Sequence, residues 1–295
     1  MPTTQIAVTA MVNGLAIGLL LFITAAGLSL IFGMMDVLNL AHGALFLTGA
    51  YLAWWIGGEQ QTWPSLARAV VAVVVLGAAA GGLLSLLTAP LSRRSHLEQA
   101  LLTLGIALVA ADILSALFGD DVRATEPPAG LDGTVTIAGW SYPSYRLALV
   151  GIAALLAAAV YWTVERTSLG ALFRATVSDR DMVATVGVDP RLVRGGVFVL
   201  GSVLATLAGL LGAPIYHARP GLDTTILVLA LVVVVVGGLG SIRGPLIAAL
   251  LFGQVESVGR AVLPGLASFL LFGTLAAVLV VRPRGLFTLA PGGRR

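Results

Sequence analysis

The stretch that decides the fold is residues 6–58, which read IAVTAMVNGLAIGLLLFITAAGLSLIFGMMDVLNLAHGALFLTGAYLAWWIGG. An apolar run over residues 6–33 is followed by a short segment with Asp36, Asn39 and His42, and then by a second apolar run. A helix that spans a bilayer needs about 20 apolar residues, so both runs are candidate membrane helices. The polar segment between them is either a loop or a break inside the membrane.

Composition extends this interpretation to the whole chain. Of 295 residues, 58% are hydrophobic and 11% are charged, whereas soluble domains carry about 25% charged residues. The surface must therefore face lipid. Cysteine is absent and every basic residue is arginine, which excludes disulfides, thiolate metal sites and the lysine of a P-loop. We predict no enzyme and no cofactor, so any ATP hydrolysis must belong to another chain.

The apolar runs predict an all-α fold, a polytopic transmembrane helical bundle. After the first run they cover residues 43–58, 65–89, 98–118, 146–164, 192–213, 225–240, 246–262 and 266–281. Some of these runs are short, and two polar segments are candidate breaks inside the membrane. We therefore predict about eight spans with broken helices, in a single transmembrane domain that covers residues 1–295.

Charge asymmetry predicts the orientation. Arginines concentrate in the segments 90–97 and 165–194 and in the C-terminal tail, whereas the segment 119–145 is mainly acidic. Cytoplasmic loops of membrane proteins carry an excess of arginine and lysine. We therefore place the arginine-rich segments and the C-terminus in the cytoplasm. The loop 119–145 and the N-terminus then lie outside.

The first polar motif lies within GLSLIFGMMDVLNLAHG, residues 27–43. The spacing of Asp36, Asn39 and His42 would put all three near one face of a helix. A broken helix also frees backbone N–H groups that can hold a carboxylate. The alternative is an ordinary turn at the membrane interface with Asp36 as a helix N-cap.

The second motif is GGLGSIRGP, residues 237–245, after a run of valines. Its glycines permit close helix packing and positive φ angles, and Pro245 suits the first turn of a new helix. The motif is either a break that lines a substrate path or a plain turn between two spans. The residues proposed for the path are Gly237, Gly238, Gly240, Ser241 and Gly244.

The third motif is the segment SLGALFRATVSDRDMVATVGVDPRLVR, residues 168–194. Ser178 and Asp181 have the spacing of a capping box, and Gly187 can end a helix in a left-handed conformation. Met182, Val183 and Val186 would form one apolar face of this short helix. The helix either docks to a partner protein or lies in the lipid headgroups.

Two single charges lie inside apolar runs. Asp112 belongs to the run 98–118, and Glu256 belongs to the run 246–262. Intramembrane charges pair with other helices or mark a pathway, unless they lie near a helix end and reach the interface. We expect both side chains to reach the interface.

Three blocks of the sequence resemble one known family. Residues 27–55, 174–189 and 237–257 resemble the conserved segments of branched-chain amino acid ABC permeases, and most closely the LivH-like subunit. The blocks occur in the order and at the spacing of that family, and the resemblance covers nearly the whole chain. One departure is Ala44, where many relatives carry an acidic residue.

The resemblance implies a bacterial importer in the inner membrane, with a second permease subunit, two ATP-binding subunits and a periplasmic or lipid-anchored substrate-binding protein. Its substrates would be branched-chain or related amino acids, with urea and small organic acids as alternatives. By resemblance, Asp36, Asn39, His42 and the glycine motif belong to the substrate path. The residues assigned to ATPase coupling are Arg174, Asp179, Arg180, Asp181, Met182, Val183, Val186 and Gly187. A secondary transporter and a channel are the rival functions.

The predicted orientation can be tested by cysteine labelling, because the native chain has no cysteine. In intact cells, an impermeant thiol reagent should label Asp121→Cys but not Arg294→Cys, because the first position is predicted to lie outside and the second in the cytoplasm. Permeabilised cells serve as the control, in which both positions should react. Labelling of position 294 alone in intact cells would overturn the orientation.

Overall fold

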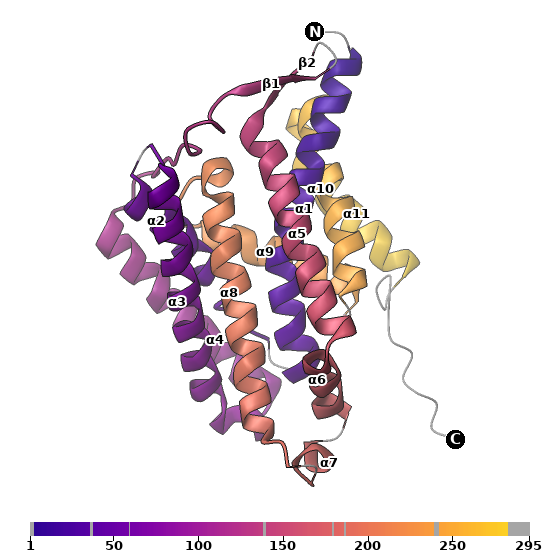
Figure 1. The fold of residues 1–295 in the computed structure, drawn as a ribbon. Helices are drawn as coiled ribbons and strands as arrows, with labels where there is room; N and C mark the ends of the chain where they lie inside the picture. Colours follow the sequence, from indigo (N-terminus) through magenta and orange to yellow (C-terminus); the bar gives the residue numbers. More distant parts are fainter. Residues whose placement is uncertain are drawn as a thin grey trace.

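The computed structural model describes residues 3–35, 38–58, 60–137, 140–178, 180–185, 187–238 and 242–282. These residues are mostly helical (Figure 1). Strands β1 (Thr134–Ile137) and β2 (Trp140–Pro143) form a small antiparallel hairpin. The predicted all-α polytopic membrane fold is confirmed, with this small hairpin as the one described addition.

Among the described residues, six helices are long and apolar enough to cross a membrane. They are α1 (Thr3–Met35), α3 (Trp63–Thr88), α4 (His96–Phe118), α5 (Ser144–Arg166), α8 (Pro190–Tyr216) and α10 (Arg243–Val262). The shorter helices are α2 (His42–Gly57), α6 (Ser168–Ser178), α7 (Arg180–Thr185), α9 (Leu222–Gly237) and α11 (Ala267–Val281), with the 3-10 turns η1 (Pro90–Arg93) and η2 (Pro264–Leu266). The total of about eight spans depends on how the short apolar helices are counted, and it stays a prediction.

Helix α1 lies at the centre of the bundle. It is apolar on all sides, as expected for a helix that other helices surround, and 89% of its most apolar window is buried. It packs against α5, α8, α9 and α10. A Cβ atom on Gly18 would lie 2.8 Å from the carbonyl oxygen of Ala249 in α10. The α1–α10 contact therefore requires glycine at this position.

Helix α8 is a second centre, and it holds α2 and α3. A Cβ atom on Gly49 of α2 would lie 2.0 Å from the carbonyl oxygen of Thr206. The Thr206 hydroxyl donates a hydrogen bond to the carbonyl oxygen of Val73 in α3 at 2.9 Å. Small residues let membrane helices approach closely, because packing rather than the hydrophobic effect drives their association.

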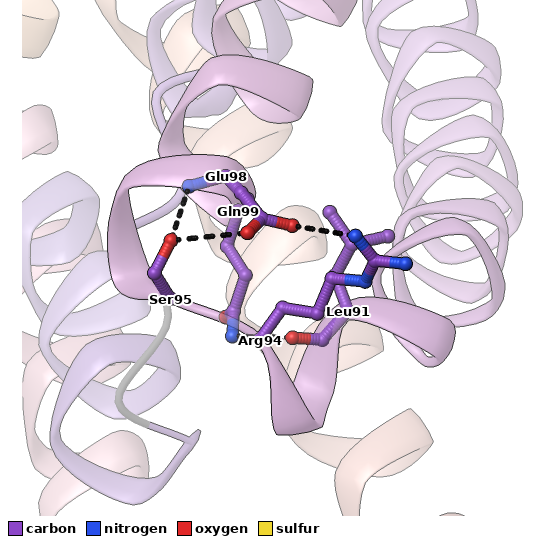
Figure 2. A network of polar contacts seen from close by, with 5 residues as sticks. All are labelled: Leu91, Arg94, Ser95, Glu98 and Gln99. Carbon is purple, nitrogen blue, oxygen red and sulfur yellow. Dashed lines mark hydrogen bonds and ion pairs between the residues drawn. The ribbon is translucent and has the colours of Figure 1, made fainter.

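The two ends of the bundle carry different structures. The β1–β2 hairpin lies at the end that holds the N-terminus, and α6 and α7 lie at the opposite end (Figure 1). The turn between α3 and α4 is closed by an Arg94–Glu98 ion pair of 3.3 Å and by a hydrogen bond of 2.8 Å from Gln99 Nε2 to the Leu91 carbonyl oxygen (Figure 2). Arg194 at the start of α8 donates to Thr88 at the end of α3 at 2.7 Å, so this turn lies at the α6–α7 end.

The separation of charge along the chain is therefore also a separation in space. The arginine-rich turn 90–97 and the segment 165–194 share one end, whereas the acidic segment 119–145 leads to the hairpin at the other. This grouping agrees with the predicted topology. The side of the membrane that each end faces stays a prediction.

The glycine contacts predict opposite effects for two matched substitutions. Gly49→Ala should lower the melting temperature in detergent, because the new methyl group would meet the Thr206 backbone and overpacking costs about 1–3 kcal/mol. Gly82→Ala in α3 should leave it unchanged or raise it, since a Cβ there meets nothing within 4 Å and alanine favours helices. Fluorescence-detected size exclusion after heating measures both. Equal stability of the two variants would contradict the close α2–α8 approach.

Candidate functional site

The first break separates α1 from α2 inside the bundle. Helix α1 ends at Met35, yet His42, the first residue of α2, lies against Thr24, with 2.8 Å between its Nε2 atom and the Thr24 carbonyl oxygen. Thr24 lies about 16 Å along the helix axis from Met35. The chain therefore turns back into the protein before α2 begins.

The residues between the helices are held by α4. The Leu40 N–H donates to the Thr103 hydroxyl at 3.1 Å, and the same hydroxyl is 3.0 Å from the Leu38 carbonyl oxygen, to which it can donate. The Asn39 side-chain oxygen accepts from the Ala41 N–H at 3.2 Å. Backbone groups away from water need partners, and these contacts supply them for the short non-helical stretch.

Two polar atoms at this break have no hydrogen-bond partner among the described residues. They are Asn39 Nδ2 and His42 Nδ1, and both side chains are 0% exposed. Because His42 Nε2 faces a carbonyl, it must be the donor, which leaves Nδ1 of a neutral ring as an acceptor. The break thus holds one unused donor and one unused acceptor. A buried group without a partner costs about 1–3 kcal/mol, so it calls for a specific explanation.

The second break separates α9 from α10. Gly238 has a φ of 99°, and its N–H donates to the Val234 carbonyl oxygen at 3.0 Å, which ends α9. A Cβ atom on Gly237 would lie 2.3 Å from the backbone nitrogen of Pro245. Glycine is therefore required at both positions. Beside this break, Arg243 donates to the hydroxyl of Tyr161 in α5 at 3.1 Å.

Helix α9 connects the two breaks. At its start, a Cβ atom on Gly43 would lie 2.1 Å from the Asp223 carbonyl oxygen, and at its end Gly237 touches Pro245. Helix α10 runs antiparallel to α1 through contacts such as that between Ala249 and Gly18. Pro245 precedes Ala249 by one turn, about 6 Å along the α10 axis. It therefore lies beside the turns of α1 that include Thr24. In Figure 1, α9 passes behind the long helices between α8 and α10. Both breaks therefore lie at a similar height on α1.

The structure divides the described residues predicted for the substrate path between the two breaks, which lie at opposite ends of α9. Asn39 and His42 form the first break, and Gly237, Gly238 and Gly244 belong to the second. Asp36, Gly240 and Ser241 lie outside the described residues. The prediction of one shared helical face is wrong for Asn39 and His42, because Asn39 precedes the first turn of α2. Sequence analysis missed Thr24 and Thr103, whose only signal is a hydroxyl within an apolar run.

The segment predicted to couple to a partner differs from the expected single helix. It forms two helices, α6 and α7, and α7 ends in the predicted left-handed glycine, since Gly187 has a φ of 88°. The Val188 N–H then returns to the Val183 carbonyl oxygen at 3.3 Å. Met182 and Val183 do not share one outward apolar face, because Met182 is 64% exposed and Val183 is 6% exposed. The prediction failed there because Val183 packs inward.

The remaining coupling residues are placed only in part. Asp179 and Val186 lie outside the described residues, as do the side chains of Arg180 and Asp181. Arg174 in α6 donates to the carbonyl oxygen of Val164 near the end of α5. This contact fixes α6 to the helix that precedes it.

The two intramembrane carboxylates also differ from each other. Glu256 is 5% exposed and forms an ion pair with Arg260, so the prediction that it reaches the interface is wrong. One turn before Glu256, Gly253 packs against α1, so Glu256 lies between helices. A charge at such a place needs a partner. Asp112 is exposed on α4.

Comparison with known proteins shows the family. The family described as branched-chain amino acid transport system / permease component matches residues 10–279. The high-affinity branched-chain amino acid transport system permease protein BraD of Pseudomonas aeruginosa is 26% identical over 290 residues, which cover 94% of each chain. LivH of Escherichia coli, a permease protein with the same description, is 24% identical over 292 residues and 94% of each chain.

A third similar protein comes from another organism. The probable branched-chain amino acid transport permease protein LivH of Methanocaldococcus jannaschii is 26% identical over 272 residues, which cover 89% of this chain and 84% of that protein. No solved structure matches the chain. Because the family match extends over most of the sequence, this chain belongs to the family of branched-chain amino acid transport permease components.

Proposed function

We propose that this chain forms the translocation path of a bacterial ABC importer for branched-chain or related amino acids. ATPase subunits in separate chains drive it, and a second permease subunit and a substrate-binding protein complete the transporter. The observation that carries the proposal is the pair of helix breaks at one height on α1. Many transporters bind substrate at interrupted helices near the membrane midplane, and the relatives named above are branched-chain amino acid permeases.

The unused polar atoms at the first break match the two charged ends of an amino acid. The Asn39 amide is a donor for a carboxylate oxygen, and His42 Nδ1 is an acceptor for an ammonium hydrogen. The first N–H groups of α2 add positive potential at the carboxylate. Buried aliphatic residues of α1 and α9 near the breaks, such as Ile23 and Ile226, suit a branched aliphatic side chain.

The conformation described here is closed around this site. Asn39 and His42 are fully buried, so a substrate reaches them only when neighbouring helices move apart. We infer that α9 moves, because its two ends lie at the two breaks, where Gly43 and Gly237 bring it against backbone. Packed helices can slide by small shear steps, and such a step at α9 would open both breaks together.

The segment of α6 and α7 has the properties of a docking element for an ATPase. One side is fixed to the bundle by the buried side chains of Phe173 and Val183. Gly170 lies so close to α5 that a Cβ atom would be 1.9 Å from the Val164 carbonyl oxygen. The other side exposes apolar residues, Leu169 and Met182 among them. An exposed apolar side chain on a rigid base is what an interface anchor requires.

The rival function, a secondary transporter, would use buried carboxylates as ion sites. Of the two intramembrane carboxylates noted above, only Glu256 is buried, and it is already paired with Arg260. The ATP dependence of uptake separates the two functions, because a secondary transporter would work in proteoliposomes without nucleotide.

The substrate site is tested by Asn39 variants. With partner ATPases and binding protein in proteoliposomes, the native chain should take up labelled leucine only with ATP, and Asn39→Leu should reduce uptake on the order of tenfold or more, since a hydrogen bond to a charged group is lost. Asn39→Ser is the matched control for the turn, because its hydroxyl can still accept from the Ala41 N–H. The serine hydroxyl lies one bond closer to the backbone than the asparagine amide nitrogen, so its O–H does not reach the same carboxylate and uptake should fall with it too.

Two results would contradict this assignment. Uptake by Asn39→Leu at the native level would leave the segment as a plain turn. Full uptake by Asn39→Ser would mean that only the turn matters and the amide touches no substrate. Competition by unlabelled isoleucine, urea and a small organic acid identifies the substrate class in the same assay.

The coupling element is tested by Met182→Asp. A charge at this exposed apolar anchor should abolish co-purification of the ATPase or uncouple hydrolysis from uptake, because truncated anchors cost about 1–3 kcal/mol or more. Arg180→Ala should have a mild effect, as rim charges contribute less. Co-purification and ligand-stimulated hydrolysis are the measurements. If Met182→Asp kept both at the native level, α7 would lie in the headgroups instead of on the ATPase.

A further inference from the structure

A segment without helix follows α4 and crosses the end of the bundle that carries the hairpin (Figure 1). It consists of residues 119–131 and is called the strap below. Glu126 forms a parallel bridge with Gln60. The indole N–H of Trp63 donates to the Ala129 carbonyl oxygen at 3.1 Å. These contacts fix the strap to the turn between α2 and α3.

The Arg123 side chain holds the start of the strap against two helices. Its Nη2 and Nε atoms donate to the Phe118 carbonyl oxygen at 2.6 and 3.1 Å, and its guanidinium carbon lies 4.8 Å from the centroid of the Trp54 ring. The last carbonyl groups of a helix lack partners within it, so a cation is stabilising there. A cation over the face of a tryptophan is also attracted by the ring. One side chain therefore joins the end of α4 to α2.

The backbone of Arg123 holds the corner between α8 and α9. Its N–H donates to the Ala218 carbonyl oxygen at 2.8 Å, and the Ala218 N–H donates to the Arg123 carbonyl oxygen at 3.1 Å. The corner begins at His217, whose φ of 52° is the one positive value of a non-glycine residue within the described ranges. Such a conformation costs free energy and persists where the surrounding structure holds it. The Arg123–Ala218 bridge supplies this support.

The corner leads directly into α9. Residues 219–221 follow Ala218, and α9 begins at Leu222. At the next residue, Asp223, the carbonyl oxygen lies against Gly43 at the first break. A connection of so few residues has a short reach, so it passes a displacement on. A movement of α9 away from the first break therefore pulls on the Arg123–Ala218 bridge.

The bridge lies where water can replace it. Residues 219–221 are exposed, and Arg123 is only partly buried. A hydrogen bond that exchanges with water contributes little net free energy, and local openings of this kind need less free energy than unfolding of the whole chain. The contact can thus open and close while the helices below it stay folded.

We propose that Arg123 is a latch on α9. While its bridge to Ala218 is closed, α9 stays against the first break, and Asn39 and His42 stay buried. When the bridge opens, the corner and α9 move together, and the strap remains on the α2–α3 turn. Arg123 acts through α9 and is therefore a positioning residue. The inference rests on the proposed function, because it names the contact that controls the proposed movement of α9.

Cysteine labelling tests the latch without transport, because the full-length chain has no cysteine. Ile226 in α9 is 0% exposed, so a charged thiol reagent reaches Ile226→Cys when α9 moves away. In lipid nanodiscs, where both faces of the membrane are accessible, Arg123→Ala should raise the labelling rate about tenfold, since the loss of hydrogen bonds from a charged group favours the open bridge. Arg123→Lys should raise it less, because lysine keeps a cation over Trp54.

A second buried position shows whether the change is confined to α9. Ala153 in α5 is also 0% exposed, and labelling of Ala153→Cys should stay low when Arg123→Ala is added. An equal rise at both positions would mean that the whole bundle has loosened, and it would overturn the latch. An unchanged rate at Ile226→Cys in the Arg123→Ala chain would overturn it as well.

A reversible disulfide tests the latch during transport. Residues that exchange both hydrogen bonds in an antiparallel pair have Cα atoms about 5.5 Å apart, which suits a disulfide. In a chain with Arg123→Cys and Ala218→Cys, oxidation should lower leucine uptake about tenfold or more in the proteoliposomes described above, and a reductant should restore it. Each single variant should be insensitive to the oxidant.

The other bridge of the strap provides the matched control. A disulfide between Gln60→Cys and Glu126→Cys fastens the strap to the α2–α3 turn alone, so uptake should stay at the native level. Equal loss of uptake with this disulfide would overturn the latch, as would native uptake by the oxidised chain with Arg123→Cys and Ala218→Cys. If the native chain takes up no leucine while Ile226→Cys is labelled as expected, the proposed function fails and the latch stands.

Discussion

The close approach of helix backbones at glycine is the constraint on which the rest of this structure depends. In lipid there is no hydrophobic force between helices, so packing and hydrogen bonds must hold the bundle together. Helix α1 can be surrounded only because Gly18 and Gly27 leave room for α10, α8 and the His42 ring. The same is true of α8 at Gly209, where a Cβ atom would lie 1.9 Å from the Phe46 carbonyl oxygen.

This packing also explains how the chain can be interrupted inside the bundle. In a membrane protein, irregular backbone is tolerated at the depth of the lipid only where protein or water surrounds it. Residues 38–41 meet this condition because the Thr103 hydroxyl forms hydrogen bonds with the backbone on both sides of Asn39. Gly238 meets it because its N–H donates a hydrogen bond back to α9. The broken segments thus depend on the tightly packed helices around them. Among the buried side-chain atoms that find no partner in the described residues are Asn39 Nδ2 and His42 Nδ1, both at the first break.

Sequence analysis could predict the helices but not the way they lie against each other. Apolar runs are local signals, so the helices on either side of residues 38–41 and the left-handed Gly187 follow from composition and spacing. The path of α9 does not follow from the sequence. An apolar helix of this length could be a short membrane span or a helix that joins two breaks. The inward turn of Val183 and the burial of Glu256 were missed for a related reason. Both depend on which neighbour covers a face, and a single sequence does not contain that information.

The connections between elements suggest how an event at one end of the bundle reaches the site. Helix α6 is fixed to the end of α5, and α5 carries Tyr161, which holds Arg243 beside the second break. Helix α7 leads into α8, whose Gly201 touches Gly27 next to His42 at the first break. A helix transmits displacement along its axis because its backbone hydrogen bonds make it stiff. A push on α6 and α7 would therefore arrive at both breaks, through α5 and α8, and α9 joins the two breaks. If the site opens as one unit, as proposed above, these two routes must move together, and the contact between α6 and α5 is then part of the opening.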